Sequence, residues 1–322
     1  MKKKQKVVLI SGVILLLVII MGIVFCQDKQ TEEIPDVEQE EEAGFETITY
    51  KGERYKYNTD LKTILFMGVD KTEKVKEQEY AGRGGQSDVL MLFVLDTNKQ
   101  QTQILQISRD SMAQVDVYDM YGEYLTTDTM QIATQYAYGD GAKKSCLLTK
   151  ETVSELLYGI PIQSYISLNI DGIAVISEAM GGIRITVPED YTWIDPSFEK
   201  GAEVVLKGAQ AEAYVRSRDT SVTGSNNNRM ERQNQVVEAV AVQLPERAKE
   251  DPNLYMKLFS SAEQYMVSDL STSELEKLST YESHLEIEQV PGEVKAGDLH
   301  DEFYVNDEEL YDLLIKLFYK KI

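Results

Sequence analysis

The chain reads T-I-L-F-M-G-V at residues 63–69, V-L-M-L-F-V-L at 89–95 and Q-I-L-Q-I at 103–107. Short, largely apolar runs of this length are typical of central strands that are covered on both faces. The polar segment 96–99 is a turn signal between the second and third runs, so these two runs are expected to form an antiparallel hairpin. The three runs together predict the centre of a buried sheet.

Charged residues flank the same strands. Asp88 precedes the second strand and Arg109 follows the third, so a hairpin brings both to one edge of the sheet. Asp70 joins them if the first strand runs with the third. Two carboxylates and an arginine suit a Mg²⁺-bound phosphate, because Mg²⁺ takes hard oxygen ligands and shares them with phosphate. Taken singly, each residue is better explained as a structural cap at a strand end, and it is their convergence that favours a site.

Helices and strands alternate along the rest of the chain. This order predicts an α/β fold, a single layered α-β-α domain with a central mixed sheet, over residues 56–322. Helices are expected at 143–158 and 171–180, extended segments at 164–170 and 183–187, and tail helices at 273–279 and 308–320.

The N-terminus predicts a membrane anchor. Residues 1–6 form a basic cytoplasmic tail, and residues 7–26 carry no charge and are long enough for one transmembrane helix. A cleaved signal peptide would have a shorter apolar region and small residues at its cleavage site, and a lipoprotein cysteine at Cys26 would not follow the bulky Phe25. Residues 27–55 are expected to form an acidic tether. The anchor and the basic tail together predict a single-pass protein of the cell membrane, with residues 56–322 outside the cell.

The composition argues against several classes of function. The formal net charge is −21, so the chain lacks the basic footprint that binding to nucleic acid requires. Cys26 and Cys146 are the only cysteines, and the predicted membrane boundary keeps them apart, so no disulfide is expected within the external domain. The only histidines are His284 and His300, which argues against a zinc site and a Ser-His-Asp triad.

Residues 213–233 read A-Y-V-R-S-R-D-T-S-V-T-G-S-N-N-N-R-M-E-R-Q and bring four arginines close together, namely Arg216, Arg218, Arg229 and Arg232. Guanidinium groups suit phosphate oxygens because they offer paired donors and stay charged. The first expectation is therefore an anionic ligand with several oxygens.

A helix is expected after this cluster, with Asn228 as its cap and Glu231 completing a capping box. At helical spacing, Arg229 and Gln233 share one face with a row of apolar residues, Val236, Val237, Val240 and Leu244. An inward arginine near the positive end of a helix is costly unless an anion or a carboxylate meets it. The spacing leaves both partners open.

Together these segments resemble the LytR-CpsA-Psr family of Gram-positive cell-envelope enzymes, over about residues 63–244 and more weakly to 318. The motifs that carry the resemblance are F-M-G-V-D ending at Asp70, Q-S-D-V-L-M-L-F-V-L around Asp88, I-S-R-D at Arg109 and Asp110, Q-Y-A-Y-G-D-G near Tyr136, G-I-P-I-Q-S-Y-I at Pro161, D-G-I-A-V-I-S-E-A-M-G-G-I at Asp171, L-K-G-A-Q-A-E-A-Y-V-R-S-R and R-M-E-R-Q. Each motif is weak alone, and their shared order makes the resemblance specific.

The resemblance implies a phosphotransferase that moves a glycopolymer from a polyprenyl pyrophosphate carrier, itself a membrane lipid, onto a sugar hydroxyl of peptidoglycan. It implies Asp70 and Asp88 as Mg²⁺ ligands. The implied residues around the pyrophosphate are the clamp Arg109, Arg216 and Arg218 and the pocket residues Arg229 and Gln233. The glycopolymer, whether teichoic acid, capsule or another, is left open.

Two positions depart from the family pattern, and the stretch 125–134 fits it only loosely, which leaves the choice of substrate open. Gln86 replaces the arginine of the family's R-S-D, and Arg83 is expected to reach the same space. Asn226 replaces a common aspartate, which leaves Asp110 or Asp219 as a possible base. These two positions keep open the alternative of a non-catalytic lipid-pyrophosphate-binding envelope protein. A pyrophosphate hydrolase is a further alternative, because water can replace the sugar hydroxyl in the same site.

The anchor predicts a protease-protection pattern. Protease added to intact cells with an accessible wall should digest the chain from Tyr55 onward and leave residues 1–6 intact, because lysines before an apolar run stay in the cytoplasm. Tags at the two ends, followed by immunoblot, measure this. Protection of Tyr55 and the residues after it would contradict the topology.

Overall fold

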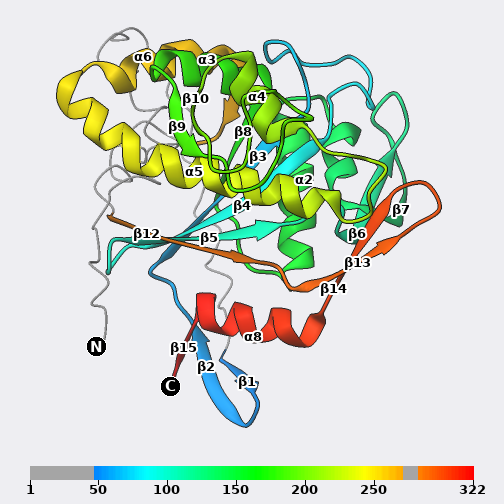
Figure 1. Cartoon of the computed structure of the whole chain (residues 1–322). Helices are drawn as coiled ribbons and strands as arrows, with labels where there is room; N and C mark the ends of the chain where they lie inside the picture. The colour runs from blue at the N-terminus through cyan, green and yellow to red at the C-terminus, as the bar shows by residue number, and fades with distance from the viewer. Residues whose placement is uncertain (1–46, 271–281) are drawn as a thin grey trace, which may run out of the picture.

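A computed structural model describes residues 47–270 and 282–322. Its centre is a mixed six-stranded sheet in the order β11-β8-β3-β4-β5-β12 (Figure 1). The strands are β3 Leu61–Val69, β4 Ser87–Asp96, β5 Gln101–Ile107, β8 Ser164–Asn169, β11 Met266–Ser268 and β12 Glu282–Gln289. Because β4 is antiparallel to both β3 and β5, the expected hairpin is confirmed and β3 runs with β5. Strands β8 and β12 lie parallel to β3 and β5, respectively.

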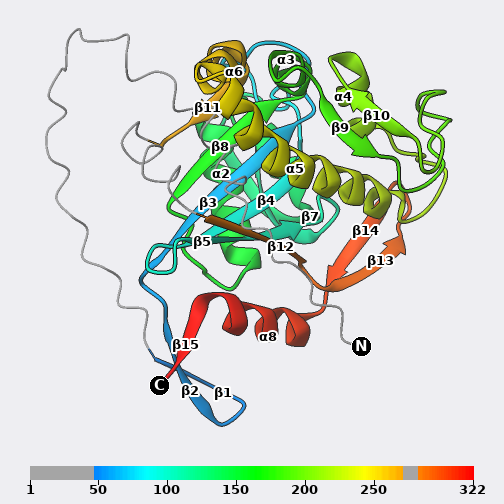
Figure 2. The same ribbon diagram turned by 60° about the vertical axis from the view of Figure 1, so that its left-hand side comes forward.

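Helices cover both faces of this sheet. In β3, Ile64 and Phe66 belong to one core cluster, whereas Leu65 and Met67 belong to the other, as the alternation of side chains along a strand requires. The first cluster packs under α3 (Asp171–Ala179), α4 (Ala209–Arg216), α5 (Ser225–Glu250) and α6 (Leu254–Ala262). The second packs under α2 (Lys143–Leu156) and α8 (Asp307–Phe318). Figure 2 shows α3, α5 and α6 together on one side, so the α-β-α layering is confirmed.

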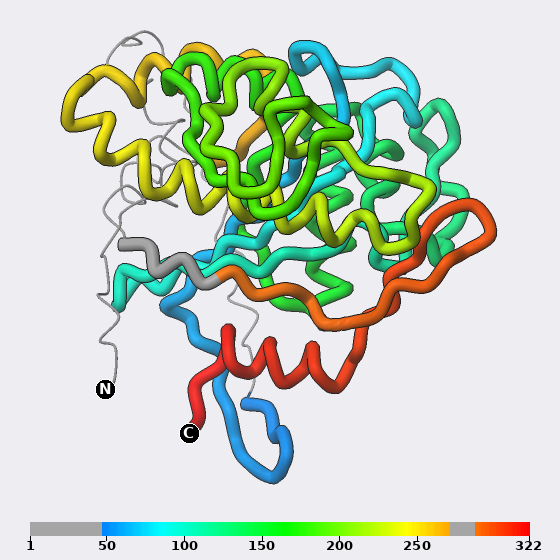
Figure 3. Tube along the Cα trace, viewed as in Figure 1, coloured from blue at the N-terminus to red at the C-terminus, as the bar shows by residue number. Residues whose placement is uncertain are grey.

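Smaller elements surround this frame. One small sheet consists of β1 (Ile48–Tyr50), β2 (Glu53–Tyr57) and β15 (Tyr319–Lys321). Three two-stranded sheets pair β6 (Met112–Tyr118) with β7 (Tyr124–Gln131), β9 (Ile183–Thr186) with β10 (Glu203–Leu206) and β13 (Gly292–Ala296) with β14 (Asp301–Val305). Two 3-10 helices are η2 (Ile132–Tyr138) and η3 (Glu263–Tyr265). Figure 3 shows the hairpin of β1 and β2 beside the C-terminal end of the chain.

The boundary of the acidic tether was predicted too late in the chain. The segment 48–57 forms β1 and β2, and β2 pairs with β15 at the far end of the sequence. The pairing partner is more than 250 residues away, so local composition carries no sign of it. The predicted anchor 7–26 and tail helix 273–279 lie outside the described residues. Within the described residues, no helix has the length and apolar character needed to cross a membrane.

The start of α5 was also predicted wrongly. The helix begins at Ser225, about one turn before the expected cap, and no side chain caps it. Gly224 precedes it with a φ of +77°, a conformation that glycine adopts readily. The backbone N–H of Gly224 donates to Asp301 Oδ2 at 2.9 Å. A carboxylate from the C-terminal part of the chain therefore helps to set where this helix starts.

Candidate active site

Asp88 lies between two arginines at one edge of the sheet. Arg229 Nη1, from α5, lies 2.8 Å from Asp88 Oδ2, and Arg109 Nη1 pairs with Oδ1 of the same carboxylate. Arg109 Nη2 also donates to Gln86 Oε1 at 2.7 Å. The expected convergence of Asp88 and Arg109 is confirmed. Gln86, which stands where the resemblance predicts an arginine, here helps to orient Arg109.

Asp70 reaches the same edge from the end of β3. Its Oδ1 accepts a hydrogen bond from the backbone N–H of Gln86 at 2.6 Å. The loop approaches this carboxylate closely because Gly85 has no side chain, and a Cβ there would lie 2.8 Å from Asp70 Oδ1. The carboxylate of Asp70 remains exposed toward the site.

Arg216 and Arg218 complete a polar cavity from the opposite side. Arg216 ends α4 and pairs with Glu212 Oε1 at 2.8 Å on the same helix. The cavity is lined by both arginines, by Arg109 and Arg229, and by the carboxylates of Asp70 and Asp88. Residues from the β3 and β4 edge and from the segment after α4 therefore meet around one space, as the sequence predicted.

Asp110 holds the arginines in place from behind the cavity. Its side chain is buried, with Oδ1 accepting from Gln131 Nε2 at 2.8 Å and lying 3.3 Å from Arg109 Nε. Oδ2 lies 3.7 Å from Arg218 Nη1. Burial raises the pKa of Asp110, against the opposing effect of the neighbouring arginines. Asp110 does not line the cavity, so its geometry fits a positioning residue rather than the catalytic residue that the sequence suggested.

The arginine cluster keeps buried donors that make no hydrogen bond. Arg218 Nη1 and Arg229 Nε are buried and make no hydrogen bond, and a buried donor without an acceptor is costly. Burial lowers the pKa of Arg229 and the Asp88 carboxylate opposes this, while the nearby Arg109 and Arg218 lower the pKa further. A bound anion would offset this mutual repulsion, so the cluster is suited to phosphate oxygens.

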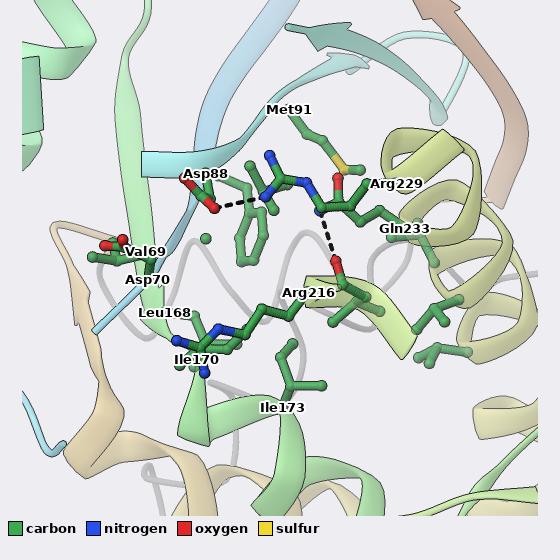
Figure 4. Close-up of a pocket in the computed structure, with 17 residues that line it drawn as sticks. Val69, Asp70, Asp88, Met91, Leu168, Ile170, Ile173, Arg216, Arg229 and Gln233 are labelled. Atoms are coloured by element: carbon green, nitrogen blue, oxygen red, sulfur yellow. Dashed lines mark hydrogen bonds and ion pairs between the residues drawn. The ribbon is translucent and has the colours of Figure 1, made fainter. Parts of the chain in front are cut away.

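An apolar cavity continues directly from the polar one. Asp70, Asp88, Arg216 and Arg229 line both cavities. Figure 4 shows the ion pair of Asp88 and Arg229 at the polar end. The apolar wall comes from β3, β4, β8, α4, α5 and the start of α3. It is formed by Phe66, Val89, Met91, Leu168, Ile170, Ile173, Val215, Val236, Val237 and Val240. An amphiphilic molecule with an anionic head fits this combination.

The face of α5 was predicted correctly, whereas the strand residues of the wall were not. Gln233 lines the apolar cavity and donates to the backbone carbonyl of Val215 at 3.1 Å. The clearest signal on the strands is Gly68, which also lines the cavity. A Cβ at Gly68 would lie 2.9 Å from Val89. A glycine within a buried strand can leave space for a cavity, but the sequence does not show on which face of the sheet that cavity lies.

Two of the predicted site arginines lie elsewhere. Arg83 is exposed, and its guanidinium lies over the Tyr80 ring at 5.5 Å, so it does not take the place of the missing family arginine. Arg232 is buried and donates to backbone carbonyls, to Tyr214 at 2.7 Å and also to Ser217. Its position favours a structural role that fixes the segment after α4.

Asp219, which the sequence offers as an alternative base, and Asn226, which departs from the expected pattern, differ in their surroundings. Asp219 is exposed and its Oδ1 accepts hydrogen bonds from Ser221, which lower its pKa. Asn226 accepts from Arg229 Nη2 at 2.7 Å and donates to Ser108 Oγ at 3.2 Å. Asn226 is therefore an uncharged hydrogen-bond partner that orients Arg229. Within the described residues, Asp88 is the only carboxylate that forms an ion pair with Arg229.

The carboxylates of Asp70 and Asp88 suit Mg²⁺ only if a bound phosphate or water supplies further oxygen ligands. Mg²⁺ is commonly bound by one or two carboxylates plus phosphate and water. Asp70 and Asp88 line one cavity, and a carboxylate that accepts from arginines keeps lone pairs for a metal. No group of three or more acidic, His or Cys side chains suited to a metal occurs in residues 47–270 and 282–322, so oxygens of a phosphate or of water would have to complete the coordination.

Comparison of the sequence with models of known protein families gives one match that spans most of the chain. A family model described as the LytR_cpsA_psr family matches residues 23–316. The chain belongs to the LytR-CpsA-Psr family. This confirms the resemblance drawn from the order of the motifs.

Two relatives within the family carry names that describe a reaction. The chain is 33% identical over 189 residues to the polyisoprenyl-teichoic acid–peptidoglycan teichoic acid transferase TagV of Bacillus subtilis strain 168, covering 55% of this chain and 42% of TagV. It is 33% identical over 181 residues to the transferase TagU of Halalkalibacterium halodurans, covering 56% of this chain and 52% of TagU. The matches thus span about half the length of these relatives.

The fold is similar to that of solved family members. TagT bound to LI-WTA superposes with a TM-score of 0.57 at 22% identity, covering 80% of this chain and 90% of that chain. At this identity the likeness concerns the fold.

Arg218 provides a test of the anion site. A charge-assisted hydrogen bond is worth about 1.5 to 3 kcal/mol, so Arg218→Ala should weaken pyrophosphate binding roughly ten- to a hundredfold, and Arg218→Lys should restore only part. The measurement is the shift in melting temperature on adding inorganic pyrophosphate with Mg²⁺. An unchanged ligand-induced shift in Arg218→Ala would remove Arg218 from the site.

Proposed function

We propose that this protein transfers a phosphate-linked glycopolymer from a polyprenyl pyrophosphate carrier onto a sugar hydroxyl of peptidoglycan. The observation that carries the proposal is the apolar cavity that opens into the arginine cluster, because the two share Asp70, Asp88, Arg216 and Arg229. This matches a ligand with an isoprenoid tail and a pyrophosphate head. The names of TagV and TagU support the same reaction.

In the proposed reaction, the hydroxyl oxygen of the acceptor attacks the phosphorus nearer the glycopolymer. A new P–O bond joins acceptor and glycopolymer, the bridging P–O bond breaks, and polyprenyl phosphate leaves with the bridging oxygen. The hydroxyl proton passes to solvent or to the leaving phosphate. The chain's contribution is to fix the pyrophosphate and offset its charge, as phosphoryl transfer mainly requires.

The residues divide these tasks by position. Arg216 and Arg218 line the polar cavity and are the more exposed of its arginines, so they are suited to the oxygens of the transferred phosphate. Arg109 and Arg229, held by Asp88, are more buried. Mg²⁺ bound between Asp70, Asp88 and the pyrophosphate would supply further neutralisation of the oxygens. The apolar wall would hold the first isoprenoid units.

The proposed location follows from the substrate and from the apolar segment 7–26. A polyprenyl carrier resides in the membrane, so an anchored domain on the outer side would meet both the carrier and peptidoglycan. The proposed transferase is therefore a single-pass membrane protein whose catalytic domain lies outside the cell.

A non-catalytic lipid-pyrophosphate binder is the second candidate, and Asn226 is the observation that favours it. A neutral amide contacts Arg229 at 2.7 Å where the family commonly has a carboxylate. An assay that follows radiolabelled glycopolymer from a synthetic lipid donor to peptidoglycan fragments separates the possibilities. Transfer supports the proposed enzyme, release without transfer indicates a hydrolase, and donor binding without turnover indicates a binder.

Asp70→Asn tests the metal. The amide retains an oxygen for the Gln86 N–H but loses the charge, so the fold should keep its melting temperature while Mg²⁺-dependent transfer falls at least about tenfold. Asp70 is the better position for this test, because a substitution of Asp88 would also break its ion pairs with Arg109 and Arg229. The exposed Asp298→Asn is the matched control. Full activity of Asp70→Asn at limiting Mg²⁺ would contradict the metal assignment.

Val237→Phe tests the lipid wall. The larger side chain should fill part of the apolar cavity that Val237 lines. Each buried CH₂ contributes about 0.8 kcal/mol, so displacing one isoprene unit should weaken polyprenyl pyrophosphate binding roughly a hundredfold or more. Calorimetric titration measures this, with inorganic pyrophosphate as the short ligand that should bind as in wild type. Val242→Phe, on the exposed side of α5, is the control, and equal lipid affinity of the two variants would refute the assignment.

A further inference from the structure

A second polar pocket lies beside the arginine cluster, on the other side of Arg218. Arg218 lines both this pocket and the anion cavity. Its walls come from the loop between β9 and β10, from the turn before α5 and from the first turns of α5. The reaction assigns no role so far to its other lining residues, among them Trp193, Asp219, Asn228 and Glu231.

Trp193 is the only tryptophan of the chain, and it is held outward. Its exposed fraction is 55%, whereas Tyr191 and Phe198 on either side of it are buried. The backbone N–H of Tyr191 donates to the carbonyl of Phe198 at 2.9 Å, and that of Ile194 donates to the carbonyl of Tyr191 at 2.8 Å. The loop is thus fixed at its base, and the indole ring that lines the pocket is more than half exposed.

The base of this loop is tied to the anion site through Arg232. The Arg232 guanidinium lies over the Tyr191 ring at 4.8 Å. The same guanidinium binds the carbonyls of Tyr214 and Ser217, which flank Arg216 and precede Arg218. One buried side chain therefore holds the tryptophan loop and the arginine segment in a fixed relation.

The polar wall of the pocket suits a neutral sugar. Asp219, Glu231 and the amide of Asn228 are exposed and provide acceptors and one amide donor pair. Hydroxyl groups donate to carboxylates, and an acetamido group pairs with an amide, while an aromatic face packs on the apolar face of a sugar ring. The same carboxylates repel a phosphate-rich polymer, so charge disfavours the donor glycopolymer here.

We infer that this pocket binds the acceptor, an uncharged N-acetylated glycan segment, with Trp193 as its stacking platform. The inference rests on the proposed function. A sugar seated there presents its hydroxyl across Arg218 to the phosphorus in the anion cavity. Donor and acceptor thus occupy separate pockets that share one arginine.

Trp193 itself reports on binding, because no other tryptophan contributes to the fluorescence. The full chain in mild detergent is titrated with chitotetraose, a soluble N-acetylated glycan, and maltotetraose serves as the sugar without acetamido groups. We expect a saturable change in tryptophan emission with chitotetraose and none with maltotetraose. No saturable change with chitotetraose overturns the inference when pyrophosphate still raises the melting temperature. Loss of both responses would overturn the proposed function as well.

Variants separate stacking from general folding. Asn228→Ala keeps the fluorophore and should weaken chitotetraose binding about tenfold, and Trp193→Ala, followed by calorimetry, should weaken it at least as much. Both should raise the acceptor KM in the transfer assay and retain the pyrophosphate-induced melting shift. Tyr121→Ala is the control, since this tyrosine is 74% exposed and outside the pocket. Equal weakening by Tyr121→Ala, or an unchanged acceptor KM in Trp193→Ala, would contradict the inference.

Discussion

The Asp88 carboxylate, shared by Arg109 and Arg229, is the interaction on which the site depends. It joins the start of β4, the end of β5 and the first turns of α5 through two ion pairs at the sheet edge. Removing one partner from such a group leaves a charge buried without compensation, which is strongly destabilising. The same arrangement leaves more guanidinium than carboxylate around the cavity, so it holds the fold together and keeps an affinity for anions.

The two departures from the family pattern fit into this arrangement. Gln86 accepts a hydrogen bond from Arg109, and Asn226 accepts one from Arg229. Both replace a charged group by a neutral acceptor, so each arginine remains oriented while the balance of charge changes. The site is thereby more dependent on Asp88, and a phosphate ligand meets guanidinium groups with fewer competing carboxylates. These contacts explain how the pocket keeps its geometry without the usual residues.

The sequence predicted the sheet and the charged edge because both follow from local rules. Apolar runs and one turn signal place β3, β4 and β5, and the hairpin then brings Asp88 and Arg109 together. The inward face of α5 followed from helical spacing. The start of α5 did not, because Asp301 from the C-terminal part holds Gly224. The sequence alone did not distinguish the role of Arg232 from that of Arg229. Arg232 donates to the backbone carbonyls of Tyr214 and Ser217, and these contacts depend on how the chain folds around the end of α4. The apolar wall joins six elements, β3, β4, β8, α3, α4 and α5, and its composition depends on how they pack.

The central claim is that one site holds an isoprenoid tail and a pyrophosphate head. Native mass spectrometry of the full chain, purified from its own cells in mild detergent, tests this most directly by weighing and fragmenting the bound lipid. We expect a polyprenyl lipid that carries phosphate or pyrophosphate, with or without attached sugars. A bound fraction made up only of bulk phospholipid, or a protein that carries no lipid even after incubation with polyprenyl pyrophosphate and Mg²⁺, would contradict it.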